Sequence, residues 1–207
     1  MKKIFLFVGL LLMSNQIMGQ SKWKNFWKQS PPIKKWIVFH PFKAKKALKI
    51  SNEAKKVSDS IVLTNLLDQD KYGGQVDAFR HAYWMARLHQ EIGKRAARSL
   101  GRAYERENYR FFKKNKLEDG VLPDKASKNM DLHNNEVGLS FTKKNVRHSN
   151  IGLIYKIVNS IEKGELKIIK KDKKGMFLTC SGEKIPSNEL LHKWVNRKCV
   201  VSSRKVK

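Results

Sequence analysis

Two short stretches of the chain combine ionisable and amide side chains with large apolar residues. The first is Asp77-Ala-Phe-Arg-His-Ala-Tyr-Trp84 and the second is Met130-Asp-Leu-His-Asn-Asn135. At about 100° per residue, a helix over the first stretch places Asp77 and His81 on one face with Trp84. A carboxylate four residues before an imidazole can share a metal ion with it, or can orient it as a general base. The first stretch therefore predicts a polar site on an otherwise apolar helix face.

A helix over the second stretch turns its polar residues inward in the same way. His133 and Glu136 fall on the expected exposed stripe, whereas Asp131, Asn134 and Asn135 fall on the opposite side. A buried carboxylate is expensive unless it is paired or hydrogen-bonded. We therefore expect the two helices to meet and to share one polar cluster, to which His133 does not belong.

The candidate site draws on both stretches. The candidates for catalysis are His81, Asp77 and Asp131, and those for substrate binding are Arg80, Asn134, Asn135, Trp84 and Glu105. The two acids also have a purely structural explanation. Asp77 would lie in the first turn of a helix capped at Gly74, and Asp131 in the first turn of one capped at Asn129, where acids stabilise the helix dipole. Both explanations stay open, and the sequence identifies neither a metal nor another cofactor.

The central helix is expected from about Gln75 to Glu91, with Gly93 ending it. Its charged stripe of Arg80, Arg87 and Glu91 is the expected solvent face, and Arg80 lies close enough to the acidic side to neutralise a carboxylate. Further helices are expected over residues 41–67, from residue 94 onward, over residues 130–142 and over residues 151–163, with an exposed loop over residues 112–128.

The chain is strongly basic, with a net charge of +26 at pH 7. A basic stripe at helical spacing is formed by Arg95, Arg98, Arg102 and Arg106, and the same spacing places Glu105 at the edge of this stripe. Such a stripe is often only a solvated face, but it is also the best candidate for phosphate contact. The charge favours a polyanionic partner, either nucleic acid, anionic lipid or envelope polysaccharide, and does not choose among them.

The chain begins with a pattern typical of a secretory signal peptide. Lys2 and Lys3 precede the apolar run Ile4–Met13, and Gly19 precedes the expected cleavage before Gln20. The apolar run is too short to span a membrane. We therefore expect an exported protein, periplasmic or extracellular, with no transmembrane span after signal cleavage.

Four segments follow from these patterns. They are a signal peptide over residues 1–19, an aromatic and basic arm over residues 20–40, a helical domain over residues 41–164 and a small tail over residues 165–207. The arm carries Trp23, Phe26, Trp27 and Trp36. We expect it to pack against the domain, although a short anchor on an anionic membrane has the same spacing.

The tail differs in character from the rest of the chain. Residues 166–169 and 176–179 are expected to pair as a β-hairpin around the turn Asp172–Gly175, followed by a short helix from Ser187. Cys180 and Cys199 are expected to form a disulfide, since an exported chain can keep one. The predicted fold class is therefore mainly α, a helical bundle core with a small C-terminal β-hairpin/α appendage.

The two polar stretches, together with Ile92-Gly93 and the continuation of the second stretch to Gly138, resemble an uncharacterised, mainly helical bacterial domain. That domain occurs in secreted proteins and at the C-terminal ends of wall-associated or RHS-type toxin proteins. The resemblance covers residues 70–142 and implies no established reaction. The related sequences commonly carry a His-Glu pair where this chain has Tyr104-Glu105, so a catalytic or metal role for position 104 is not transferred.

Two classes of function remain open. The first is a small exported hydrolase that acts on a phosphate-containing or other polyanionic substrate through the Asp/His/Asn cluster. The second is a non-catalytic basic envelope or polyanion-binding protein whose cluster only locks the helices together. A cavity that reaches His81 distinguishes the enzyme, because catalysis requires substrate access to the cluster.

Overall fold

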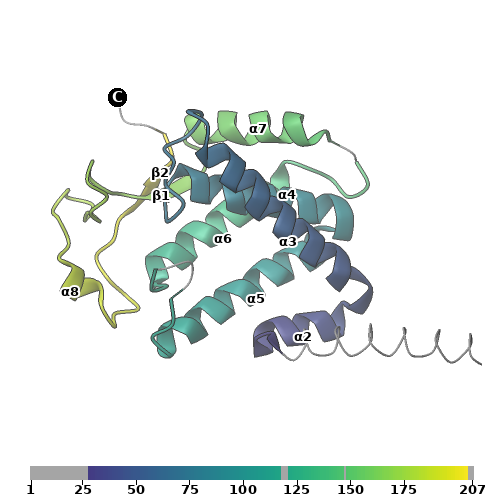
Figure 1. The fold of residues 1–207 in the computed structure, drawn as a ribbon, viewed down its shortest axis with the longest axis horizontal. Coiled ribbons are helices and arrows are strands. Elements are labelled where there is room, and N and C mark those ends of the chain that lie inside the picture. Colours follow the sequence, from purple (N-terminus) through teal and green to yellow (C-terminus); the bar gives the residue numbers. More distant parts are fainter. Residues whose placement is uncertain (1–27, 118–120, 147, 205–207) are drawn as a thin grey trace, which may run out of the picture.

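A computed structural model describes residues 28–117, 121–146 and 148–204 of the chain. The expected signal peptide and three aromatic residues of the arm, Trp23, Phe26 and Trp27, lie outside the described residues. The described helices are α2 (Pro31–Phe39), α3 (Pro41–Val62), α4 (Gln75–Ile92), α5 (Lys94–Lys113), α6 (Lys125–Ser140), α7 (Asn150–Glu162) and α8 (Ser187–Leu190), and the strands are β1 (Lys167–Ile169) and β2 (Val200–Ser202). The mainly α fold class is confirmed (Figure 1).

The central helix α4 is covered by α3, α5, α6 and α7 (Figure 1). Its charged stripe was expected to face solvent, and this expectation is wrong because α3 lies over it. Arg87 Nε donates a hydrogen bond to Glu53 Oε1 at 2.9 Å, and Lys46 Nζ lies 3.0 Å from Glu91 Oε2. Burial raises the pKa of Glu53, but hydrogen bonds from Arg87 and Tyr83 outweigh burial and hold that pKa below its ordinary value.

Helix α6 begins earlier than the sequence analysis expected. Its N-cap is Asp124, whose Oδ1 accepts a hydrogen bond from Ser127 N at 2.8 Å, so the expected cap at Asn129 is wrong. Residues 125–128 therefore belong to the helix and not to a loop, because the Asp124 cap satisfies one of its first backbone N–H groups. Asp131 lies in the second turn, where the dipole explanation for a first-turn acid no longer applies.

The described part of the aromatic arm packs against the bundle, as expected. Ile33 and Trp36 of α2 are buried, and α2 lies along α5. The indole Nε1 of Trp36 is 3.2 Å from the carbonyl oxygen of Ala96 and 2.9 Å from Ser99 Oγ. These contacts give the tryptophan an apolar environment and a satisfied N–H group at once.

The tail contains the Cys180–Cys199 disulfide, with the two Cα atoms 4.9 Å apart. The expected turn is present, since Gly175 N donates to Asp172 O. The hairpin is shifted, because residues 176–179 pair with the residues just after β1, through the Lys171–Phe177 bridge, whereas β1 itself pairs with β2. Cys199 bonds to both sides of this hairpin, Leu178 O and Lys170 N, and the disulfide holds it there at the start of β2.

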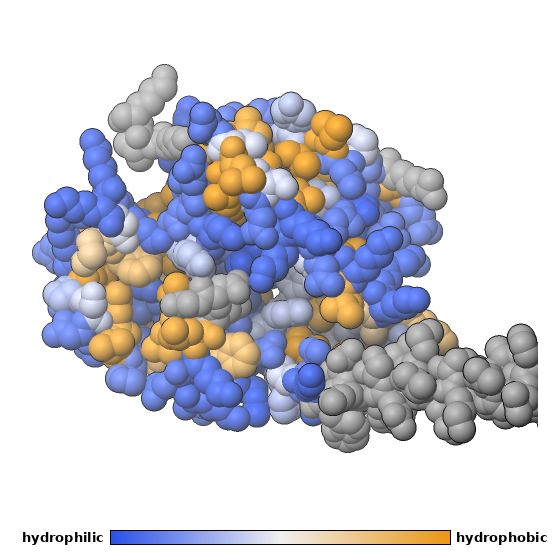
Figure 2. All heavy atoms as spheres, viewed as in Figure 1, coloured by the Kyte–Doolittle hydropathy of each residue, from blue (hydrophilic) through white to orange (hydrophobic). Residues whose placement is uncertain are grey.

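The surface drawn in Figure 2 is mostly hydrophilic, with separate apolar patches. Among the described helices, none is long and apolar enough to cross a membrane. The apolar residues gather instead around α4, where Phe79, Tyr83, Met85 and Leu88 are fully buried.

The closest approach of α4 and α6 gives the first prediction. A Cβ atom added at Gly138 would lie 2.3 Å from the carbonyl oxygen of Ala82 and 2.7 Å from its Cα. Because both atoms are backbone, Gly138→Ala must separate the helices and should lower the free energy of unfolding by about 1–3 kcal/mol. Chemical denaturation measures the loss.

Gly101→Ala is the matched control, since a Cβ there meets mainly the flexible end of Met85, with Met85 Cε at 2.8 Å. Alanine also favours a helix over glycine by about 0.5–1 kcal/mol. This gain offsets part of the steric cost of the contact with Met85, so Gly101→Ala should lose less stability than Gly138→Ala. Equal stability of Gly138→Ala and the wild type would show that the two helices are not in tight contact.

Candidate functional site

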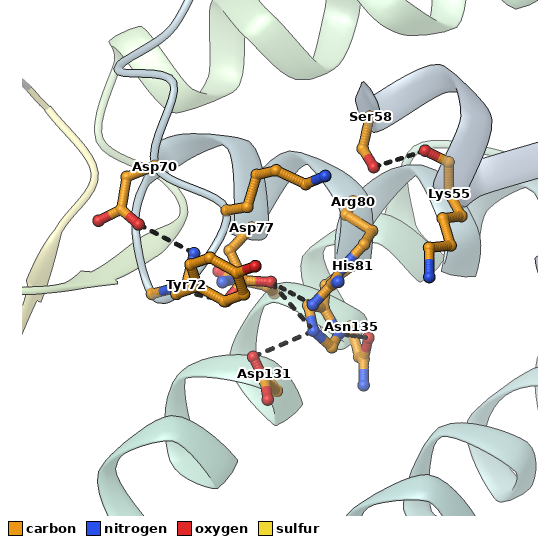
Figure 3. A network of polar contacts seen from close by, with 12 residues as sticks. Lys55, Ser58, Asp70, Tyr72, Asp77, Arg80, His81, Asp131 and Asn135 are labelled. Carbon is orange, nitrogen blue, oxygen red and sulfur yellow. Dashed lines mark hydrogen bonds and ion pairs between the residues drawn. The ribbon is translucent and has the colours of Figure 1, made fainter. Parts of the chain in front are cut away.

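Residues from α4 and α6 form one buried group, the Asp–His–Asp cluster, which consists of Asp77, His81 and Asp131 (Figure 3). The imidazole Nε2 of His81 lies 3.2 Å from Asp131 Oδ1 and 3.6 Å from Asp77 Oδ1. Its Nδ1 lies 3.2 Å from Asn135 Oδ1. The two polar stretches therefore meet in space, and four of the predicted site residues contact one another.

The backbone before α4 holds Asp77 in place. The N–H of Gly73 donates to Asp77 Oδ2 at 2.8 Å. Asp68 accepts a hydrogen bond from Gln75 N at 2.7 Å and so satisfies a backbone N–H at the start of α4, where Gly74 has no side chain to do so. The loop therefore both caps the helix and orients its acid.

Arg80 turns from the charged stripe toward the cluster. Its Nη2 donates to Asp77 Oδ1 at 2.7 Å, as the sequence analysis anticipated. Asp77 and Asp131 are buried, whereas the His81 side chain keeps 14% of its surface exposed. The group contains two carboxylates and one guanidinium, so with a neutral imidazole and ionised acids it carries a net negative charge. This charge favours a cation at the centre, either a proton on the imidazole or a metal ion.

A cavity of about 300 Å³ opens on the His81 side of the cluster, between α3, α4 and α5. It is lined by Ser51, Asn52, Ala54, Lys55, Arg80, His81, Trp84, Tyr104, Glu105 and Asn108. Trp84 forms a fixed wall, because its Nε1 donates to Ser51 Oγ at 2.9 Å and its ring meets Tyr104 edge-on at 5.0 Å. His81 is therefore accessible to a small molecule, as the enzyme class requires.

A second, smaller cavity of about 50 Å³ lies on the Asp77 and Asp131 side. Tyr72, Phe177 and Lys198 contribute to its wall, so the loop before α4 and the C-terminal tail both border it. A volume of this size holds about one or two water molecules. Arg80 lines both cavities and thus reaches from the larger space to the acids.

The predicted residues do not all join the cluster. Asn134 faces β1, where its Nδ2 donates to Lys167 O at 2.9 Å and its Oδ1 accepts from Lys167 N at 2.8 Å. Both halves of its amide thus pair with a strand backbone, away from the two cavities. His133 is exposed, with Nε2 at 3.0 Å from Glu165 O, which agrees with leaving it out of the site.

Glu105 was expected at the edge of the arginine stripe, and this expectation is wrong. Only 2% of its surface is exposed, and it lines the larger cavity. Helix α5 packs against both α4 and α6, so more of its circumference is covered than the spacing of its arginines suggests. Glu105 therefore shares the larger cavity with His81 and adds a carboxylate to its wall.

Sequence reasoning missed Lys55 and Asn108 as lining residues of the larger cavity. Lys55 belongs to a run of lysines on α3, and nothing in the sequence separates it from its neighbours. Asn108 follows Glu105 by three residues, which is helical spacing. A search for polar residues sharing the inward face of α5 would have found it.

The arginine stripe lies on the outer side of α5 and lines a shallow groove together with Ser99. Arg95, Arg102 and Arg106 are exposed, whereas Arg98 makes a bidentate pair with Glu136, with both contacts at 2.6 Å. The hydrogen bonds from Arg98 hold the pKa of Glu136 below its ordinary value. Three arginines of the stripe therefore present their charge to solvent.

The fold and the site define a mainly α-helical domain with a buried Asp–His–Asp cluster beside a ligand-sized cavity. The chain belongs to the family described as a domain of unknown function (DUF6973), whose family model matches residues 34–165. The matched region contains the whole cluster and the residues lining the larger cavity. No curated protein and no solved structure matches the chain.

The contact between α6 and β1 gives the second prediction. Asn134→Ala removes both hydrogen bonds to Lys167, so the backbone N–H and carbonyl groups of Lys167 lose the Asn134 amide as their partner. The free energy of unfolding should fall by about 1–3 kcal/mol, as measured by chemical denaturation. His133→Ala, at the exposed neighbouring position, is the control and should change stability by less than about 0.5 kcal/mol. Similar losses in the two variants would contradict the special role of the Asn134 amide.

Proposed function

We propose that this protein is a small hydrolase that acts on a phosphate-containing substrate. The observation that carries this proposal is the cavity of about 300 Å³ that reaches His81. Its volume lies at the lower end of ordinary ligand sites, which span roughly 300–1,000 Å³. Arg80 and Lys55 bring positive charge to its wall, as an anionic substrate requires.

The cavity walls supply the parts that hydrolysis of a phosphate ester needs. Arg80 and Lys55 contact the phosphate oxygens and stabilise the negative charge that grows on them in the transition state. Trp84 and Tyr104 give an apolar wall for the organic part of the substrate. The attacking water forms a bond to phosphorus and loses a proton to a base, while the ester P–O bond breaks and the leaving oxygen takes up a proton.

The base belongs to the group around His81. Both ring nitrogens of His81 already contact protein groups, Nε2 with Asp131 and Nδ1 with Asn135. A general-base role for the imidazole requires one of these contacts to open during the reaction. Glu105 offers a second carboxylate at the cavity wall, and the cluster acts with it as one unit.

The cellular setting forms part of the proposal. Residues 1–19 have the signal-peptide pattern, and the Cys180–Cys199 disulfide fits an oxidising compartment. We therefore assign the activity to the periplasm or the extracellular space. A role as a secreted toxin fits the resemblance to the ends of RHS-type proteins.

The second candidate function is a non-catalytic basic protein that binds polyanions, with a cluster that only locks α4 to α6. The exposed arginines Arg95, Arg102 and Arg106 favour it, because they lie along one groove. Such a surface binds the phosphate backbone without reading sequence. The same surface also serves the hydrolase, where it holds a long polyanionic substrate near the cavity.

The third prediction tests the hydrolase. The wild type should cleave at least one of p-nitrophenyl phosphate, bis(p-nitrophenyl) phosphate, single-stranded DNA and vesicles of phosphatidylglycerol. His81→Gln and Asp131→Asn should each lower kcat/KM by about 100-fold or more, the usual contribution of positioned acid–base groups. Circular dichroism checks that the variants are folded.

His89→Gln is the matched control, because His89 is a buried histidine of the same helix that contacts Leu139 O and lies outside the cluster. It should retain most of the activity. Activity that survives both cluster substitutions, or a wild type inactive on every substrate class, would favour the second candidate function.

The fourth prediction concerns the arginine stripe. Binding of the full chain to single-stranded DNA should weaken steeply with salt, with a slope near −0.7 per phosphate contacted. Replacing Arg95, Arg102 and Arg106 by glutamine should weaken binding and lower that slope, as measured by fluorescence anisotropy. The control is the triple replacement of Lys45, Lys49 and Lys56 on α3 by glutamine, which removes the same amount of positive charge from another face. Equal losses from the two triple variants would show a diffuse charge effect and no binding groove.

A further inference from the structure

We propose that the Asp–His–Asp cluster holds one divalent first-row transition-metal ion. Asp77, His81 and Asp131 each offer one ligand atom, and these three atoms lie within 4.8 Å of one another. This inference rests on the proposed function and deepens it, because the ion supplies the electrophile that polarises the phosphate and lowers the pKa of a bound water.

The spacing of the three atoms fits one ion. Metal–nitrogen and metal–oxygen bonds of about 2.0–2.2 Å in tetrahedral geometry place neighbouring ligands about 3.3–3.6 Å apart. The distances from His81 Nε2 to the two carboxylates are 3.2 Å and 3.6 Å. The carboxylate oxygens that the two acids offer are at most 4.8 Å apart, so a small movement of the side chains brings both to the ion.

The second ring nitrogen of His81, Nδ1, is hydrogen-bonded in the way that is usual for metal-binding histidines. Asn135 Oδ1 lies 3.2 Å from Nδ1 and accepts a hydrogen bond from its N–H group. With the proton on Nδ1, Nε2 is an acceptor that lies beside one carboxylate oxygen of each acid (Figure 3). Acceptors this close repel one another, and a metal ion bound among them removes that repulsion.

The acids are oriented from outside the ligand group in the same way. Gly73 N–H donates to Asp77 Oδ2 and leaves Oδ1 to the shared point. Hydrogen-bonded partners such as this N–H fix ligand geometry and raise metal affinity in known metal proteins. Arg80 acts in the opposite sense, because its guanidinium contacts the same Oδ1 and lowers the net negative charge of the ligand group.

The ligand types select the class of ion. One imidazole and two carboxylates suit zinc or manganese, whereas magnesium and calcium prefer oxygen ligands alone. Three protein ligands leave at least one position for water or substrate, which is the arrangement of catalytic and not of structural zinc sites. The larger cavity is lined by His81 and Arg80, and the smaller one by Asp77, Arg80 and Asp131, so water or a phosphate oxygen can approach the ligand group from either cavity.

The test is metal binding itself, measured apart from activity. The full chain, purified without a histidine affinity tag and treated with a chelator, is titrated with zinc chloride and manganese chloride by isothermal titration calorimetry. We expect one ion per chain for at least one of the two metals. His81→Gln and Asp131→Asn should abolish this binding, and Asn135→Ala should weaken it by about 10- to 100-fold.

His89→Gln separates the cluster from general histidine binding, since it removes a buried histidine that lies outside the ligand group. It should bind the ion like the wild type. No binding by the wild type, or equal binding by the wild type and His81→Gln, overturns the proposal without needing any variant to be active.

Failure of this inference can be told from failure of the proposed function. If hydrolysis persists after chelation and no ion is bound, the metal proposal is wrong and the hydrolase proposal is supported. If the wild type binds one ion, His81→Gln does not, and the metal-loaded protein hydrolyses no phosphate substrate, the metal proposal is supported and the hydrolase proposal is wrong.

Discussion

The structure depends on the burial of two carboxylates between α4 and α6. A buried carboxylate without partners would be strongly unfavourable, so each acid must be met by donors or cations. Asp77 meets Gly73 N–H and Arg80, and Asp131 lies beside His81 Nε2, where either a proton or a metal ion balances its charge. Because Gly138 lets the α6 backbone come against Ala82, the helices approach closely enough for these short contacts. The polar cluster and the tight helix crossing therefore require each other.

The elements around this pair divide the work. Helix α3 covers the charged stripe of α4 through Glu53 and Lys46, and at the same time provides one wall of the larger cavity. Helix α5 carries its arginines outward and Glu105 inward, so a single helix serves both the surface and the site. The cavity thus lies between three helices at His81, and its walls combine the aromatic side chains of Trp84 and Tyr104 with the basic side chains of Arg80 and Lys55.

The sequence predicted the part of this arrangement that follows from helical periodicity. Asp77, His81, Asp131 and Asn135 share inward faces, and a period of 3.6 residues is enough to find them. Helical periodicity does not show which charged residues a neighbouring helix covers. For this reason Arg87 was assigned to the solvent face and Glu105 to the edge of the arginine stripe. The pairing of β1 with β2 was also missed, because a disulfide acting over 19 residues decides it and local pattern does not. Asn134 was placed correctly on the inward side, but its actual partner, a strand edge, is a tertiary feature.

Gly73 links the cluster to the far end of the chain. Its N–H holds Asp77, and its carbonyl oxygen accepts a hydrogen bond from Ile169 N at 2.7 Å. Nε2 of Gln75, two residues before the acid, donates to Ser203 O at 2.8 Å. Ile169 and Ser203 both lie beyond residue 165, where the family match stops. The hydrogen-bonded unit around the cluster is thus larger than the region that the family model matches: in this chain the loop that holds Asp77 is itself supported by a segment outside residues 34–165.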